Sequence, residues 1–104
     1  MSPGPIDDLF GVLADPTRRA ILQRLVHDGP RTATELAVDS PLTRQAIVKH
    51  LQALVDADLA HPEREGRSVR YRATPARLAD AVAWLVSASE GWDRRATRLP
   101  RKRA

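Results

Sequence analysis

A helix-like stretch in the middle of the chain, PLTRQAIVKHLQAL at residues 41–54, carries side chains that could read another molecule. Its leucines and isoleucine recur at the spacing of one helix face, which leaves a second face for solvent or a partner. That outward strip consists of Arg44, Gln45, Val48, Lys49 and Gln52. Arginine and lysine can donate to guanine or phosphate, glutamine can bond to adenine, and valine can contact a thymine methyl. The strip is either ordinary solvated surface or a base-reading surface formed by Arg44, Gln45, Val48 and Lys49.

Side chains suited to phosphate contacts lie before this strip, at its start and near its end. Thr34 and Thr43 each carry a hydroxyl that can donate to a phosphate oxygen. Gln52, later in the same helix, could reach the backbone of the same duplex. We expect these three residues to contact phosphate if the outward strip enters a major groove.

Four arginines follow in close succession and form a second group of donors; they are Arg64, Arg67, Arg70 and Arg72. Arg67 stands beside Gly66, where a tight turn is expected, and is the best placed to reach a minor groove or a phosphate. Arg70 and Arg72 share one strand face by alternation, so they either contact phosphate or are solvated. All four are candidate contacts to a nucleic-acid backbone.

The sequence offers no recognisable catalytic or metal-binding pattern. Cysteine is absent, which excludes disulfides, thiolate metal sites, iron–sulfur clusters and cysteine nucleophiles. The three histidines, His27, His50 and His61, have no partner at metal-ligand spacing. His50 lies beside the apolar face of its helix, which favours a partly buried structural role. Asp56 and Asp58 lie where this helix ends, so a role in the turn accounts for them better than a catalytic carboxylate pair. We expect neither an enzyme nor a metal or cofactor site.

The net charge of +4 comes from the end of the chain rather than from its body. Six of the 17 lysines and arginines lie at or after position 94, in a segment without acid, so the preceding residues hold 11 basic against 13 acidic side chains. The basic end is either a solvated tail or a phosphate contact. We expect a flexible lead-in at residues 1–5, one domain at 6–95 and a disordered basic tail at 96–104.

Start and stop signals place these side chains on defined elements. The expected helices begin at Pro5, after the cap Asp15 at Pro16, at the capping box of Thr32 and Glu35, after the cap Thr43, and after the cap Thr74 at Pro75. Residues 59–65 and 68–74 alternate with period two around a Gly-Arg turn, which predicts a β-hairpin. The order predicts a mainly α (α+β) fold, a winged helix-turn-helix of five helices with a two-stranded β-hairpin wing between helices 4 and 5.

In this order and at these spacings, the segments resemble the ArsR-type family of winged helix-turn-helix transcriptional repressors. The matching stretches are LADPTRRAILQRL (13–25), TATELA (32–37), LTRQAIVKHLQAL (42–54), LVDADLAHPEREGRSVRYR (54–72) and the tryptophan-containing last helix. Together they cover about residues 6–95. The resemblance implies a sequence-specific DNA-binding regulator that represses its own operon and takes double-stranded DNA as its partner.

Metal-sensing members of this family typically carry a Cys-x-Cys pair in the third helix, where this chain has Ala37 and Asp39. Others use aspartate and histidine pairs in the last helix, where this chain offers Asp80 and Glu90 without a histidine. The resemblance is therefore to the metal-independent branch, without a cofactor. The sequence does not reveal whether a small-molecule inducer exists.

The last helix carries two apolar stripes, and one is enough to dock it onto its own domain. The second stripe requires another surface and, with the apolar side of the first helix, it predicts a two-fold homodimer interface. Two copies would present two recognition helices to the half-sites of an inverted repeat. The expected interface consists of Ile6, Leu9, Phe10, Leu13, Ala81, Trp84, Leu85, Ala88 and Trp92.

A competing hypothesis is a winged-helix module that binds protein through its long helix and anchors nonspecifically to nucleic acid through its basic end. Deletion of residues 96–104 separates the two, because nucleic-acid binding would collapse for the module and specificity would survive for the repressor. The N-terminus lacks a basic region followed by an apolar run, and no segment reaches the roughly 18 apolar residues of a membrane span. We expect a soluble, cytoplasmic protein that does not contact a membrane.

Overall fold

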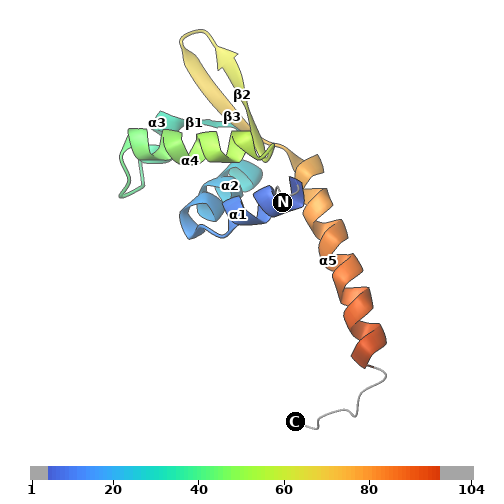
Figure 1. Cartoon of the computed structure of the whole chain (residues 1–104). Helices are drawn as coiled ribbons and strands as arrows, with labels where there is room; N and C mark the ends of the chain where they lie inside the picture. Colours follow the sequence, from blue (N-terminus) through green and yellow to red (C-terminus); the bar gives the residue numbers. More distant parts are fainter. Residues whose placement is uncertain (1–4, 97–104) are drawn as a thin grey trace.

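A computed structural model describes the backbone of residues 5–96 and the side chains of residues 7–91 (Figure 1). Its helices are α1 (Pro5–Leu13), α2 (Pro16–Asp28), α3 (Ala33–Ala37), α4 (Arg44–Asp56) and α5 (Pro75–Ala96), and its strands are β1 (Arg31–Thr32), β2 (Ala60–Glu65) and β3 (Ser68–Ala73). Within these residues, five helices and a hairpin between α4 and α5 confirm the predicted winged helix-turn-helix. The predicted lead-in and basic tail lie outside the described residues, except that Pro5 begins α1 and Ala96 ends α5.

Side-chain caps hold the starts of α2 and α4. The carboxylate of Asp15 accepts hydrogen bonds from the backbone N–H groups of Thr17 and Arg18, at 2.7 and 3.2 Å. Thr43 Oγ1 accepts one from the N–H of Ala46 at 3.1 Å. These bonds satisfy N–H groups that the first helical turn leaves without a partner, so both helices begin where the sequence predicts.

The starts of α3 and α5 are held differently from each other. Thr32 and Glu35 form the predicted capping box, in which each residue's side chain accepts from the other's backbone N–H, at 3.1 and 2.9 Å. Helix α5 begins at Pro75 as predicted, but the Thr74 hydroxyl lies 3.2 Å from Nδ1 of His61. A hydroxyl can bond to a histidine and still accept from a backbone N–H, so the cap at Thr74 stays a prediction.

In the described part of the chain, the wing belongs to a three-stranded antiparallel sheet of order β1-β3-β2. The sequence predicts β2 and β3 but not β1, which pairs with β3 through Arg31 opposite Tyr71 and Thr32 opposite Arg70. Two residues are too few for a period-two pattern, which is why β1 escapes prediction. Gly66 has a φ of +62°, the positive value that a type II′ hairpin turn requires at its first central position.

The inner face of α4 lies in the hydrophobic core. Ile47, Leu51 and Leu54 are at most 1% exposed, as their helical spacing predicts. Leu36 of α3 and Leu59, which precedes β2, pack into the same cluster. Burial of each such side chain stabilises the fold by roughly 1.5–3 kcal/mol. This face fixes α4 to the domain and leaves the opposite face of the helix outside.

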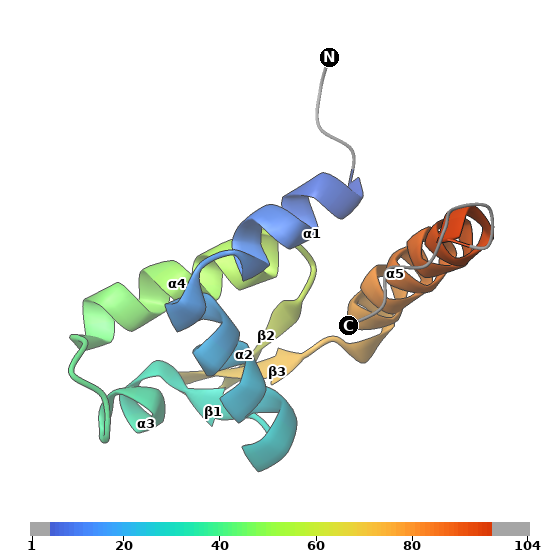
Figure 2. The ribbon, with the colours of Figure 1, turned by 90° about the horizontal axis from the view of Figure 1, so that it is seen from below.

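Among the described residues, α5 docks onto the domain through its first half. Leu78 packs against the core, and Trp84 meets Phe10 edge-on with their ring centroids 5.4 Å apart. Farther along, residues 82–90 are exposed and the helix projects from the body (Figures 1 and 2). The radius of gyration is 17.6 Å, whereas a compact domain of about 100 residues has a radius of about 13 Å. Residues 82–90 of α5 therefore have little packing from their own chain.

Two members of the predicted dimer interface are buried within the single chain. Leu9 has no exposed surface and Ala81 is 7% exposed in the single chain, because α1 packs against the start of α5. Leu9 therefore has no surface to lose to a second copy and Ala81 has little, so these two side chains can contribute little to a dimer interface. The side chains of Ile6 and Trp92 lie outside the described residues. The other predicted members keep surface and are Phe10, Leu13, Trp84, Leu85 and Ala88.

Candidate nucleic-acid interface

A groove between α3, the start of α4 and the wing collects donors from segments that are distant in sequence. Its lining contains Thr34 from α3, Arg44 and Val48 from α4, and Arg67 from the hairpin turn. The remaining lining residues are Thr32, Ala33, Ser68, Val69 and Tyr71. The fold thus brings together candidate base-reading, phosphate and wing residues on one side of the molecule.

A second hollow follows the outer face of α4 beside this groove. It is lined by Thr43, Arg44, Gln45, Ala46, Val48 and Lys49. Arg44, Gln45 and Lys49 are exposed, whereas Val48 is partly buried because it also packs against the core. The first turns of α4 therefore present charged and amide donors around one apolar point, which is the pattern needed to contact base edges.

Arg44 is held in place by a neighbouring helix. Its Nε donates to Thr34 Oγ1 at 3.2 Å, so a residue of α3 supports a candidate base-reading residue of α4. This bond uses the Nε–H of the guanidinium and leaves its two terminal nitrogens without an intramolecular hydrogen bond in the described part of the chain. The Thr34 hydroxyl proton remains available for a phosphate oxygen, so the two roles of Thr34 are compatible.

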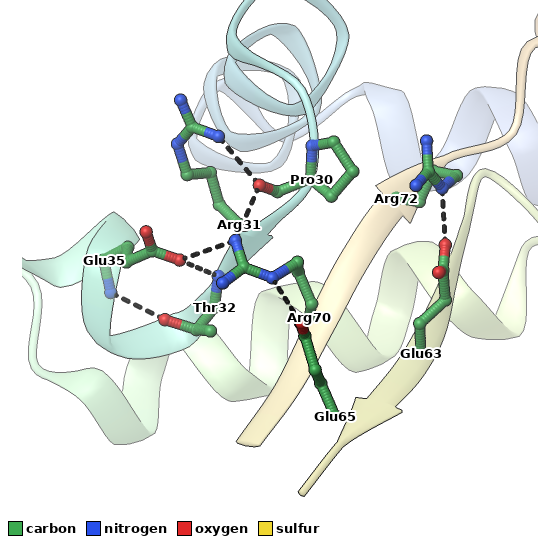
Figure 3. Close-up of polar contacts among 8 residues, drawn as sticks. All are labelled: Pro30, Arg31, Thr32, Glu35, Glu63, Glu65, Arg70 and Arg72. Atoms are coloured by element: carbon green, nitrogen blue, oxygen red, sulfur yellow. Dashed lines mark hydrogen bonds and ion pairs between the residues drawn. The ribbon is translucent and has the colours of Figure 1, made fainter.

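The four wing arginines divide into two pairs. Arg70 donates to Glu65, Glu35 and the carbonyl oxygen of Pro30, and Arg72 donates to Glu63 (Figure 3). Within residues 7–91, Arg64 and Arg67 have no hydrogen-bond or ion-pair partner. Carboxylates of the same chain thus already pair with two of the four arginines predicted to contact phosphate. The other two arginines have no such partner within residues 7–91.

Hydrogen bonds lower the pKa of two carboxylates near the wing, those of Glu35 and Glu63. The hydrogen bond from the Thr32 backbone N–H is the main cause that lowers the pKa of Glu35 below its ordinary 4.5, and the positive charge of Arg70 contributes. The hydrogen bond from the Arg72 side chain likewise lowers the pKa of Glu63. Both acids are charged at neutral pH, so they continue to hold their arginines there.

Three other residues singled out in the sequence lie away from the groove or serve the core. The side-chain amide of Gln52 donates to Asp56 at 2.9 Å, one turn farther along α4, and Gln52 lines neither hollow. His50 is partly buried, as predicted, and its Nδ1 has no hydrogen-bond partner in the described part of the chain. Tyr71 packs against the core and also lines the groove.

Neither a metal cluster nor a membrane helix occurs in the part of the chain that the structure describes. No group of three His, Asp or Glu side chains there lies close enough together to hold a metal ion. No helix there is both long and apolar enough to cross a membrane.

The chain is similar to known regulators in sequence and in structure. Residues 13–63 match the model of a helix-turn-helix domain. The HTH-type transcriptional regulator Rv2034 of Mycobacterium tuberculosis is 42% identical over 73 residues, which are 70% of this chain and 67% of that protein. The transcriptional repressor SdpR of Bacillus subtilis is 29% identical over 82 residues, covering 79% of this chain and 90% of that protein. An ArsR-like transcriptional regulator from Rhodococcus sp. RHA1 has a solved structure with 37% sequence identity and a TM-score of 0.80, covering 90% of this chain and 88% of that one. The chain belongs to the ArsR family of winged helix-turn-helix transcriptional regulators.

Membership of the ArsR family makes the chain a DNA-binding transcriptional regulator rather than an enzyme. The matched residues 13–63 contain α2, α3, α4 and the first part of β2. In this ArsR-family fold, α3 and α4 are the two helices of the helix-turn-helix, and the groove beside them is the candidate DNA interface.

Residues of this ArsR-family chain that its sequence does not single out also shape the groove. Ser68 and Val69 line it, and Glu35 holds an arginine of the wing. The strand alternation contains a signal for Val69, because it must face away from Arg70 on the neighbouring position of β3. No local signal identifies the contact between Glu35 and Arg70, since the two residues are far apart in sequence.

Proposed function

We propose that the chain is a homodimeric, sequence-specific repressor that binds an inverted-repeat operator upstream of its own gene. The observation that supports this most directly is the groove between α4 and the wing, where Arg44 and Arg67 both lie. A recognition helix and a wing arginine that line the same groove can contact one duplex together, the helix in the major groove and the wing along the backbone.

The first turns of α4 read the operator bases. Arg44 and Lys49 donate to guanine, Gln45 makes a bidentate bond to adenine, and Val48 contacts a thymine methyl. The support for these roles is that all four side chains line the hollow on the outer face of α4.

The phosphate backbone is contacted by Thr34, Thr43, Arg64 and Arg67. The two threonines flank the base-reading face, and the two arginines have no partner among the side chains of residues 7–91. Arg70, Arg72 and Gln52 are not part of this proposal, because intramolecular acceptors already hold their donors.

A second copy of the chain covers the exposed apolar face of α5. Val82, Trp84, Leu85 and Val86 are each 50% exposed or more on a helix that projects from the body. Such an apolar surface is unfavourable in water and is covered when two copies pack together. A two-fold arrangement would place the two α4 helices at half-sites one or more helical turns apart.

The proposed repressor needs neither a metal nor a cofactor. This part of the proposal is supported by the absence of cysteine in the whole chain and by the lack of a cluster of potential ligands within residues 7–91. We place its site of action in the cytoplasm, on DNA and away from membranes, and no inducer is part of the proposal.

A titration of two duplexes tests the proposed function. Purified protein is added to the DNA upstream of its own gene and to a shuffled duplex of equal length, at several salt concentrations. We expect the upstream DNA to bind at least a thousandfold more tightly, with affinity falling steeply as salt rises. Equal affinity for the two duplexes would contradict sequence-specific repression.

A further inference from the structure

We infer that Arg70 is a positioning residue that fastens the wing to the helix-turn-helix, rather than a contact to DNA. This inference rests on the proposed function, because it concerns how the wing is positioned against the DNA duplex. The structure that carries it is a network of hydrogen bonds around Arg70 (Figure 3).

Arg70 connects three separate segments of the chain. Its Nε donates to Glu65 on β2 at 3.0 Å, which joins the two strands of the hairpin. Its Nη1 donates to the carbonyl oxygen of Pro30 and to Oε1 of Glu35, both at 3.3 Å. Pro30 precedes β1 and Glu35 lies on α3, so a single guanidinium links the wing to the start of the helix-turn-helix.

Glu35 performs two tasks with one carboxylate oxygen. Oε1 accepts from the backbone N–H of Thr32, which closes the capping box, and the same oxygen accepts from Arg70. The wing is thus attached to the residues that set where α3 begins. A glutamine at this position can still complete a capping box but carries no charge to hold Arg70, so this substitution keeps the first task and weakens the second.

The backbone alone provides little attachment between the wing and this helix. The β1·β3 pairing consists of two residue pairs, and one of them is Thr32 opposite Arg70 itself. A ladder this short is marginal without side-chain support. The Arg70 network therefore reinforces the sheet at the position where the wing meets the rest of the fold.

Arg72, on the same strand face as Arg70, forms an ion pair that stays within the hairpin. Arg72 pairs with Glu63, and both residues belong to the hairpin. Loss of Arg72 removes one positive charge from the same strand but leaves the attachment of the wing to α3 intact. Arg72→Gln and Glu63→Gln are therefore matched controls for Arg70→Gln and Glu35→Gln.

The consequence of this attachment falls on Arg67. It lies in the hairpin turn and lines the groove together with Arg44. A wing that swings away from α3 carries Arg67 away from the duplex that α4 contacts. The attachment through Arg70 thus sets how well the wing arginine and the recognition helix engage the same DNA.

The first test is a double-mutant cycle on operator affinity. We expect Arg70→Gln to weaken binding about fivefold more than Arg72→Gln, the size that a network of half-exposed ion pairs supports. Arg67→Ala should then reduce operator affinity by a much smaller factor in the Arg70→Gln background than in the wild type. In that background the wing is no longer held beside the DNA that α4 contacts. Multiplicative effects of Arg67→Ala and Arg70→Gln, or equal losses for Arg70→Gln and Arg72→Gln, would overturn the inference.

The second test uses the sign of the effect at Glu35. If Arg70 contacted phosphate, Glu35→Gln would release it and remove a negative charge near DNA, so binding would tighten at least as much as with Glu63→Gln. A positioning role predicts weaker binding for Glu35→Gln than for Glu63→Gln. Affinity of Glu35→Gln equal to or above that of the control would contradict the role of Arg70 as a positioning residue.

Amide hydrogen exchange without DNA separates this inference from the proposed function. Arg70→Gln should speed exchange in β1 and in the adjoining residues of β3, whereas Arg72→Gln should leave it unchanged. Unchanged exchange in both variants would overturn the inference even if the operator binds as proposed. Wild-type protein that binds its operator no more tightly than other DNA would instead contradict the proposed function. The exchange result would still test the role of Arg70 in the fold.

Discussion

Arg44 differs from the other donors on the outer face of α4 because a neighbouring residue already orients it. The Thr34 hydroxyl accepts from its Nε, which restricts a long side chain before any DNA is bound. Ordering a flexible side chain on binding costs affinity, so a side chain oriented in advance binds more tightly.

The contribution of Thr34 can be measured with two substitutions. Thr34→Val keeps the shape of the side chain and removes the acceptor, and we expect it to lower operator affinity severalfold and to weaken the preference for the base that Arg44 reads. Thr34→Ser restores the hydroxyl and should restore both properties. Binding to operators with single base changes checks this, and equal behaviour of the two variants would show that the hydroxyl does not position Arg44.

Substitutions of Gln45 and Arg67 are predicted to change DNA binding in different ways. Gln45→Ala should cost about 1–3 kcal/mol at one base position and relax specificity there. Arg67→Ala should weaken binding to all sequences alike, because a phosphate contact carries no sequence information. Affinities for a set of single-base operator variants distinguish the two patterns. The same pattern for both substitutions would refute the division between base reading and phosphate contact.

At the scale of elements, local rules predict most of the helices and fewer of the contacts between them. Capping and proline signals place the starts of α2, α3 and α4 because each depends on residues within one turn. The same reasoning does not predict the contact between the Thr74 hydroxyl and His61 of the facing strand. It also fails for Arg70 and Glu35, because their pairing depends on a β1·β3 register that no sequence periodicity encodes.

The cap of α2 makes stability depend on pH. The hydrogen bond from the Arg18 backbone N–H is the main cause that lowers the pKa of Asp15 below its ordinary 3.8. A lowered folded-state pKa means that the unfolded chain binds the proton first, so this stabilisation is complete above the ordinary pKa and is lost as pH falls through the folded-state pKa.

Asparagine at position 15 tests this dependence, since it can cap a helix but cannot titrate in this range. We expect the melting temperature of the wild type to fall between about pH 5 and pH 2 and the Asp15→Asn variant to show a smaller fall. Asp15→Ala, which loses the cap, should be less stable at neutral pH as well. Thermal melts across this pH range check both expectations, and parallel curves for wild type and Asp15→Asn would contradict the assignment to Asp15.

At the scale of the whole molecule, the projecting part of α5 is the surface that most needs a partner. Leu85 is 53% exposed, so Leu85→Glu costs the single chain little but places a charge in the proposed dimer interface. We expect this variant to remain folded, to sediment as a monomer and to lose operator affinity strongly. Val38→Glu, which changes an exposed valine at the end of α3, should leave the dimer intact. A Leu85→Glu variant that stays dimeric would contradict the proposed interface.

A genome-wide map of the DNA bound by the protein tests the central claim most directly, because it reports operator sequence, half-site spacing and regulated genes together. A homodimeric repressor predicts a small set of sites that share an inverted repeat, with half-sites one or more helical turns apart and one site upstream of its own gene. Bound DNA that shares no sequence, or shares single half-sites without a symmetric partner, would contradict it.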